Sequence, residues 1–140
     1  MVPGTAPATS RRTAQRGWVL AATVLVADDD ADILRIVELN LRWEGFEVVT
    51  ARDSPDALAK TVAVRPDLVL LDVRMPGIDG YTICARIRAD SSLAAIPVII
   101  VTANHGATEV EAARRAGADD FLVKPFLPTT LLDMAKAMLS

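Results

Sequence analysis

Short apolar runs alternate with amphipathic stretches along most of the chain. The apolar runs are rich in Val, Ile and Leu and have the length of β-strands. They cover residues 23–27, 47–51, 68–71, 98–101 and 120–123. The run at 68–71 is apolar at every position, which is typical of a strand covered on both faces of a sheet.

The stretches between these runs show helical spacing or helix boundary signals. They cover residues 32–44, a segment from Ser54 to the residue before Pro66, 81–89, 109–116 and 129–139. Ser54 is the expected N-cap of its helix, with Pro55 at the first helical position. Gly45 and Gly117 are the expected ends of two others.

Apolar residues at helical spacing give the expected buried faces of three helices. In the first these are Ile33, Ile36, Val37 and Leu41, in the second Ala57, Leu58 and Val62, and in the last Leu131, Leu132, Ala135 and Met138. Trp43 is expected to pack within the first helix. Trp18 is assigned to the N-terminal segment, with no partner at a site.

Strict alternation of strands and helices predicts an α/β fold. Parallel strands joined by right-handed helical crossovers place helices on both faces of one sheet. The expected architecture is therefore a doubly wound, five-stranded parallel sheet with five helices. No internal repeat at a fixed period is evident.

Residues 1–21 differ from the rest of the chain. They contain Pro, Gly, Thr, Ser and Arg without an apolar period, so we expect a disordered leader at 1–21 followed by one domain at 22–140. Arg11-Arg12 and the apolar run at 18–27 resemble a signal peptide. Small and polar residues interrupt that run, however, and cleavage after it would remove the first strand.

Composition indicates one globular domain. The chain has 140 residues, of which 51% are hydrophobic and 24% charged, enough for a single core. A net charge of −3 argues against broad nucleic-acid binding. No stretch is long and apolar enough to span a bilayer, so we expect no membrane contact.

Cysteine and histidine each occur once. Cys84 has no partner for an internal disulfide and is expected to be a small core residue. With His105 as the single histidine, no zinc cluster of His and Cys exists. His105 is expected at the surface near the site, where it would only tune access.

Polar residues follow four of the five predicted strands. In open parallel sheets, ligands bind beyond the carboxyl ends of the strands. The residues at those ends are Asp28, Asp29, Asp30, Asp72, Thr102 and Lys124. Asp30 or Asp32 is explained as a helix N-terminal residue, but that role does not account for an acidic pair at the end of a buried strand.

This edge is expected to bind Mg²⁺ and a phosphoryl group. Two aspartates from the first strand and Asp72 would repel one another strongly without a cation. Mg²⁺ prefers oxygen ligands, and together with Lys124 it would balance the three carboxylates. Asp72 could then attack phosphorus as a nucleophile, while Thr102 donates a hydrogen bond to a phosphoryl oxygen. Ala103 is small and leaves room for that group.

Four segments carry a resemblance to a known family. They are VLVADDDADI (24–33), DLVLLDVRMPGIDG (67–80), VIIVTAN (98–104) and GADDFLVKPF (117–126). In this order and at these strand ends they resemble the signature segments of CheY-like response-regulator receiver domains. The resemblance runs from about Thr23 to Ser140, and it implies the flavodoxin-like strand order 2-1-3-4-5.

The resemblance also implies roles for individual residues. Asp72 corresponds to the phosphoacceptor, and Asp28, Asp29, Asp72 and the backbone carbonyl of Arg74 correspond to the Mg²⁺ ligands. Thr102 and Phe121 correspond to switch residues, and Lys124 to the lysine that contacts the phosphoryl group. Lys124-Pro125 corresponds to a cis peptide. Arg74 and Asn104 are expected to influence the lifetime of the acyl phosphate.

The implied function is signal reception in a two-component His-Asp phosphorelay in the cytoplasm. A sensor histidine kinase or a histidine phosphotransfer protein would phosphorylate Asp72. The receiver would assist its own phosphorylation and dephosphorylation without being an enzyme in the ordinary sense. Phosphorylation would remodel the face formed by the fourth helix, fifth strand and last helix, which could also pair in a homodimer. The receiver would stand alone, acting on a downstream protein, or belong to a longer regulator with an output domain.

Two other classes of protein fit the sequence less well. A pseudo-receiver, which binds proteins without phosphorylation, is disfavoured by the complete set of acids, Thr102 and Lys124. An unrelated phosphatase with an aspartate nucleophile commonly has a second Asp two residues later, and that position is Arg74. No substrate-binding insertion is visible either.

Overall fold

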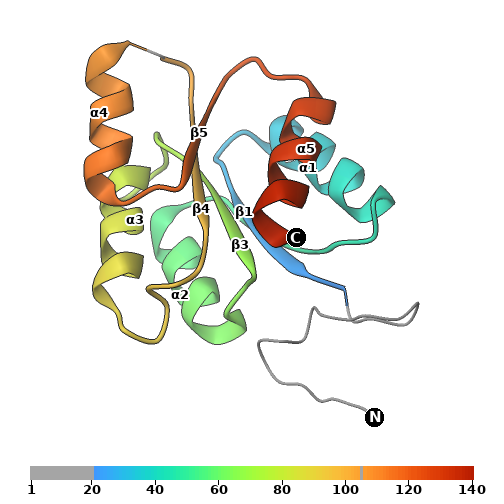
Figure 1. Cartoon of the computed structure of the whole chain (residues 1–140), viewed down its shortest axis with the longest axis horizontal. Helices are drawn as coiled ribbons and strands as arrows, with labels where there is room; N and C mark the ends of the chain where they lie inside the picture. Colours follow the sequence, from blue (N-terminus) through green and yellow to red (C-terminus); the bar gives the residue numbers. More distant parts are fainter. Residues whose placement is uncertain (1–20, 105) are drawn as a thin grey trace.

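A five-stranded parallel sheet lies at the centre of the computed structural model, with helices on both faces (Figure 1). The structure describes residues 21–104 and 106–140. The predictions of a disordered leader and of a surface position for His105 fall on residues outside these ranges. The described part contains the elements β1 (Thr23–Ala27), α1 (Ala31–Trp43), β2 (Glu47–Ala51), α2 (Ser54–Val64), β3 (Leu68–Asp72), α3 (Gly80–Ala89), β4 (Val98–Thr102), α4 (Ala107–Ala116), β5 (Asp120–Val123) and α5 (Pro128–Leu139).

The strand order is β2-β1-β3-β4-β5, which confirms the predicted topology. All four strand pairs are parallel. The order reverses between β1 and β3, so these two strands lie side by side, with Ala27 level with Leu71. This reversal is the switch point where open α/β sheets place their ligands. It brings the ends of the first and third strands together.

Two cores form, one on each face of the sheet. Alternate residues of β3 point to opposite faces, so Val69 and Leu71 enter one core while Leu68 and Leu70 enter the other. The first core includes residues of α2, α3 and α4, and the second includes residues of α1 and α5. The two helix groups lie on opposite sides of the sheet in Figure 1. Cys84 is fully buried in the first core, as predicted.

Capping side chains set the starts of three helices. Asp30 begins α1 by accepting hydrogen bonds from the backbone N–H groups of Asp32 and Ile33, as predicted. Asp79 caps α3 in the same way. The prediction for α2 was wrong by one residue, since Asp53 is the N-cap. Ser54 is the first helical residue, and its hydroxyl instead donates to the carbonyl of Ile78.

The predicted buried faces were partly wrong. In α1 the buried residues are Leu34, Val37 and Leu41, whereas Ile36 is 52% exposed. Trp43 does not pack within its helix, because it is 88% exposed. Val62 of α2 is also exposed, and Thr61 is buried in its place. Leu131 and Ala135 of α5 are buried, as predicted.

Within the described residues, none of the helices has the length and hydropathy needed to cross a bilayer.

Candidate phosphoryl and metal site

Three carboxylates meet where β1 and β3 end. Asp28 and Asp29 directly follow β1, and Asp72 is the last residue of β3. One carboxylate oxygen from each lies within 4.8 Å of the other two. Asp28 and Asp72 are buried, while Asp29 is exposed. The sequence-predicted acids are therefore assembled in a single cluster.

Lys124, which directly follows β5, completes this cluster. Its ammonium nitrogen Nζ lies 2.8 Å from Asp28 Oδ2 and 3.1 Å from Asp72 Oδ1. The backbone N–H of Lys124 donates to the carbonyl of Thr102, which fixes the residue beside the end of β4. The peptide bond between Lys124 and Pro125 is cis. One cation thus bridges two of the three carboxylates.

A single lysine does not neutralise the three acids. Burial, together with repulsion from Asp28, raises the pKa of Asp72 to about 6, although its hydrogen bond and charge interaction with Lys124 oppose the change. Burial alone would lower the pKa of Lys124, but hydrogen bonds and charge interactions with Asp28 and Asp72 outweigh it and raise the pKa. The cluster therefore carries excess negative charge in the absence of a further cation.

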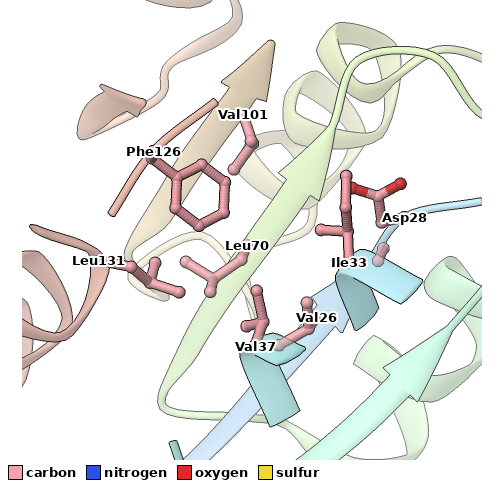
Figure 2. Close-up of a pocket in the computed structure, with 9 residues that line it drawn as sticks. Val26, Asp28, Ile33, Val37, Leu70, Val101, Phe126 and Leu131 are labelled. Carbon is pink, nitrogen blue, oxygen red and sulfur yellow. The ribbon is translucent and has the colours of Figure 1, made fainter. Parts of the chain in front are cut away.

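Apolar side chains form the floor of the site. Figure 2 shows Asp28 at one end of a group of apolar side chains that includes Val26, Ile33 and Leu70, with its carboxylate beside Ile33. Phe126 and Val101 continue this group toward β4 and α5. Asp28 is held above it by Lys124 and by the backbone N–H of Asp30, which donates to Asp28 Oδ1 at 2.9 Å. An apolar floor strengthens the electrostatic interactions above it, because it excludes water.

The other predicted residues lie around the same cleft. The cleft has a volume of about 620 Å³ and is lined by Asp29, Asp30, Asp72, Val73, Arg74, Thr102, Ala103, Asn104, Glu109 and Lys124. Thr102 is buried, and its hydroxyl accepts from the backbone N–H of Asn104 at 3.1 Å. Phe121 lies apart from the cleft lining, half-buried against the core beneath α3 and α4.

Sequence reasoning missed one acidic residue of this cleft. Glu109 was placed at the start of a helix, and no role was given to it. It lies in the first turn of α4, which follows the loop after Thr102, and it lines the cleft with Asp72. Its position soon after a strand end was the available signal, since the loop and first helical turn there face the same edge of the sheet.

The donor set suits a hard divalent cation. Three carboxylates on two adjacent strand ends supply the oxygen ligands that Mg²⁺ prefers, and the open cleft leaves room for water or phosphoryl oxygens. Such an ion would balance the negative charge of the cluster that Lys124 leaves uncompensated. The residues present therefore fit Mg²⁺.

Fold and site together define a doubly wound α/β protein with an acidic cleft at its switch point. The model of the response regulator receiver domain family matches residues 24–136, and the chain belongs to this family. Receiver domains are phosphoacceptor switches of two-component systems, bind Mg²⁺ in their acidic pocket, and partner with histidine kinases.

Named relatives support this assignment. The transcriptional regulatory protein PrrA of Mycobacterium tuberculosis is 41% identical over 121 residues, which cover 86% of this chain and 51% of PrrA. The DNA-binding response regulator MtrA of the same species is 39% identical over 116 residues, covering 83% of this chain and 50% of MtrA. The chain thus spans about half the length of these curated relatives.

A solved structure shares the fold. The chemotaxis protein CheY4 of Vibrio cholerae superimposes with a TM-score of 0.80 at 34% identity, covering 84% of this chain and 98% of CheY4.

Proposed function

We propose that this chain accepts a phosphoryl group on Asp72 in a Mg²⁺-dependent reaction and thereby acts as a two-component signalling switch. The observation that carries the proposal is the convergence of three carboxylates within 4.8 Å, with Lys124 bridging two of them. Asp28, Asp29, Asp72 and the backbone carbonyl of Arg74 would hold the ion. When bound, Mg²⁺ would neutralise charge on the phosphoryl oxygens.

In the proposed reaction a carboxylate oxygen of Asp72 attacks phosphorus. An O–P bond forms as the bond between phosphorus and the donor nitrogen breaks, and the leaving imidazole or ammonia takes up a proton. Lys124, already 3.1 Å from Asp72 Oδ1, would stabilise the charge on a transferred oxygen. The Thr102 hydroxyl, whose oxygen accepts from the Asn104 N–H, would donate its own hydrogen to another phosphoryl oxygen.

The phosphoryl donor is proposed to be a sensor histidine kinase or a histidine phosphotransfer protein. Movement of Thr102 toward the phosphoryl group would leave space behind it for Phe121, which follows on the neighbouring strand β5. Such a change would remodel the face formed by α4, β5 and α5. That face would act on a downstream protein, on an output domain such as the relatives' names suggest, or on a second copy of the chain.

Intact-mass measurement tests this proposal. Incubation with Mg²⁺ and phosphoramidate is expected to add one phosphoryl group to the parent protein and none to the Asp72→Asn variant. Asp133→Asn, an exposed aspartate of α5 remote from the cleft lining, is the matched control and is expected to be phosphorylated like the parent. An unchanged parent mass with several small donors would instead favour a phosphorylation-independent binding module.

A further inference from the structure

Glu109 is a further acidic residue at the proposed phosphoryl site. It lines the cleft with Asp72 and Thr102 but lies outside the cluster of three metal-binding carboxylates. It comes from α4 and not from a strand end, and its side chain is half-buried. Glu109 therefore borders the cleft that a phosphoryl group on Asp72 would enter.

Tyr81 of α3 holds this carboxylate in place. The Tyr81 hydroxyl donates to Glu109 Oε1 at 2.9 Å, and it also lies 3.4 Å from the Glu109 backbone carbonyl. The Tyr81 ring packs against the core beneath α3 and α4. Among residues 21–104 and 106–140, no lysine or arginine forms an ion pair with Glu109. The carboxylate is thus oriented by a neutral donor that leaves its charge unbalanced.

The charge balance of the cleft gives Glu109 an effect on phosphorylation. With Mg²⁺ bound, the ion and Lys124 offset the three clustered aspartates, as argued above. Converting the Asp72 carboxylate to an acyl phosphate adds about one further negative charge near neutral pH. Glu109 lines the same cleft, so we expect its carboxylate to repel that added charge.

We propose that Glu109 is a determinant of phosphoryl affinity at Asp72, and that Tyr81 is the positioning residue that holds the Glu109 carboxylate in place at the edge of the cleft. This inference rests on the proposed phosphorylation of Asp72. Glu109 repels the phosphoryl group, whereas Lys124 attracts it. The two residues together therefore set the affinity of the site for a phosphoryl group.

Binding of beryllofluoride, an anionic phosphoryl mimic, tests the role of Glu109. Bound and free beryllofluoride are distinguished by ¹⁹F NMR in the presence of Mg²⁺. Glu109→Gln keeps the size of the side chain and its hydrogen-bond acceptor but removes the charge. Its affinity for beryllofluoride is expected to rise on the order of fivefold at low salt. The gain should shrink at high salt, because ions screen the repulsion across an open cleft.

A matched control lies on the same helix. Glu111 of α4 is ion-paired with Arg114 and Arg115 and is not part of the cleft lining. Glu111→Gln also removes one negative charge from α4, but it leaves the charges that line the cleft unchanged. Its affinity for beryllofluoride is expected to equal that of the parent.

Tyr81→Phe tests the positioning role. Loss of the hydroxyl frees the Glu109 side chain to turn toward solvent, so beryllofluoride affinity should rise, though less than in Glu109→Gln. Adding Tyr81→Phe to Glu109→Gln should change the affinity no further, because the charge that Tyr81 positions is already absent. A purely structural contribution of Tyr81 would persist in the double variant.

The single tyrosine also reports on this contact directly. Tyr81 is the only tyrosine of the chain, so ultraviolet absorbance follows its ionisation without labelling. Burial, then the hydrogen bond and charge of Glu109 and the charge of Asp79, raise the pKa of Tyr81 to about 12. Glu109→Gln is expected to lower that pKa.

The outcomes separate this inference from the proposed function. A parent protein that neither binds beryllofluoride nor gains mass from phosphoramidate overturns both. A parent that does both, with unchanged or weaker beryllofluoride binding in Glu109→Gln, overturns the role of Glu109 alone. A gain that is independent of salt would also contradict it, since repulsion between charges must be screened. Circular dichroism of each variant verifies that it is folded.

Discussion

At neutral pH the Asp72 carboxylate is ionised in the folded protein, and this ionisation lowers the free energy of unfolding. Its pKa in the folded state is about 6, against 3.8 for an ordinary aspartate, because burial and Asp28 disfavour its charge. The folded state therefore holds this proton more tightly than the unfolded chain does. As pH rises from about 4 through about 6, the folded state loses stability relative to the unfolded chain. The proposed nucleophile is therefore also a group whose charge destabilises the metal-free fold at neutral pH.

Removing the charge of Asp72 should consequently stabilise the metal-free protein. Asp72→Asn is expected to raise the free energy of unfolding by about 1–2 kcal/mol at neutral pH in the presence of EDTA. Urea denaturation at several pH values measures this, and the gain should vanish below about pH 4, where the parent carboxyl group is protonated. Asp133→Asn, on the exposed side of α5, should change little. A variant less stable than the parent at neutral pH would contradict the argument.

Close packing between elements fixes where Asp72 lies. At Gly80, the first residue of α3, an added Cβ would lie only 2.4 Å from the backbone carbonyl oxygen of Asp72. The N–H of Gly80 also donates to the carbonyl of Val73 at 2.9 Å. Helix α3 thus begins in contact with the end of β3, and backbone atoms there cannot move aside as a flexible side chain would.

Gly80→Ala is expected to lower the free energy of unfolding by about 2–3 kcal/mol, because α3 must move away from β3. Gly45→Ala is the matched control. Gly45 has φ 99° but nothing within 4 Å of an added Cβ, so only backbone strain of about 1 kcal/mol is expected. Only Gly80→Ala should also slow phosphorylation of Asp72. If Gly80→Ala and Gly45→Ala lose equal stability, and Asp72 is phosphorylated in Gly80→Ala as fast as in the parent, then α3 accommodates the added methyl group and the argument from close packing is wrong.

The sequence predicted the elements well and their faces less well. The positions of strands and helices follow from the alternating apolar pattern and from Gly, Pro and capping residues, which depend on local chemistry. The strand order 2-1-3-4-5 was instead implied by the resemblance to receiver domains. The predicted burial of Ile36 and Trp43 in α1 was wrong, because an apolar side chain is not necessarily buried and half of this chain is hydrophobic. The site acids were predicted because parallel strands end at one edge. Glu109 was missed because its place in the cleft depends on a tertiary contact with Tyr81.

At the scale of the whole molecule, the two ends of the sheet differ. At the starts of β4 and β5, the Arg88 guanidinium donates to the carbonyls of Gly117, Ile96 and Ala94 and pairs with Asp119 at 2.6 Å. Asp119 in turn accepts from the N–H of Val98. That end is closed by satisfied hydrogen bonds. The opposite end holds the three acids, whose charge Lys124 balances only in part. A change of charge there therefore affects the end of the sheet that has fewer satisfied interactions.

Magnesium should therefore stabilise the entire fold through this one end. A ligand that binds only the folded state adds about 1.4 kcal/mol of unfolding free energy for each tenfold increase in its concentration well above Kd. Urea denaturation across a Mg²⁺ series measures this at constant ionic strength, which is needed because the chain has a net charge of −3 and any salt screens its self-repulsion. Asp29→Asn removes an exposed carboxylate from the cluster, and it should shift the dependence to higher Mg²⁺ concentration while leaving the fold intact. Equal stabilisation of parent and variant would mean that Mg²⁺ acts as a general salt, and the cluster would then not be a binding site.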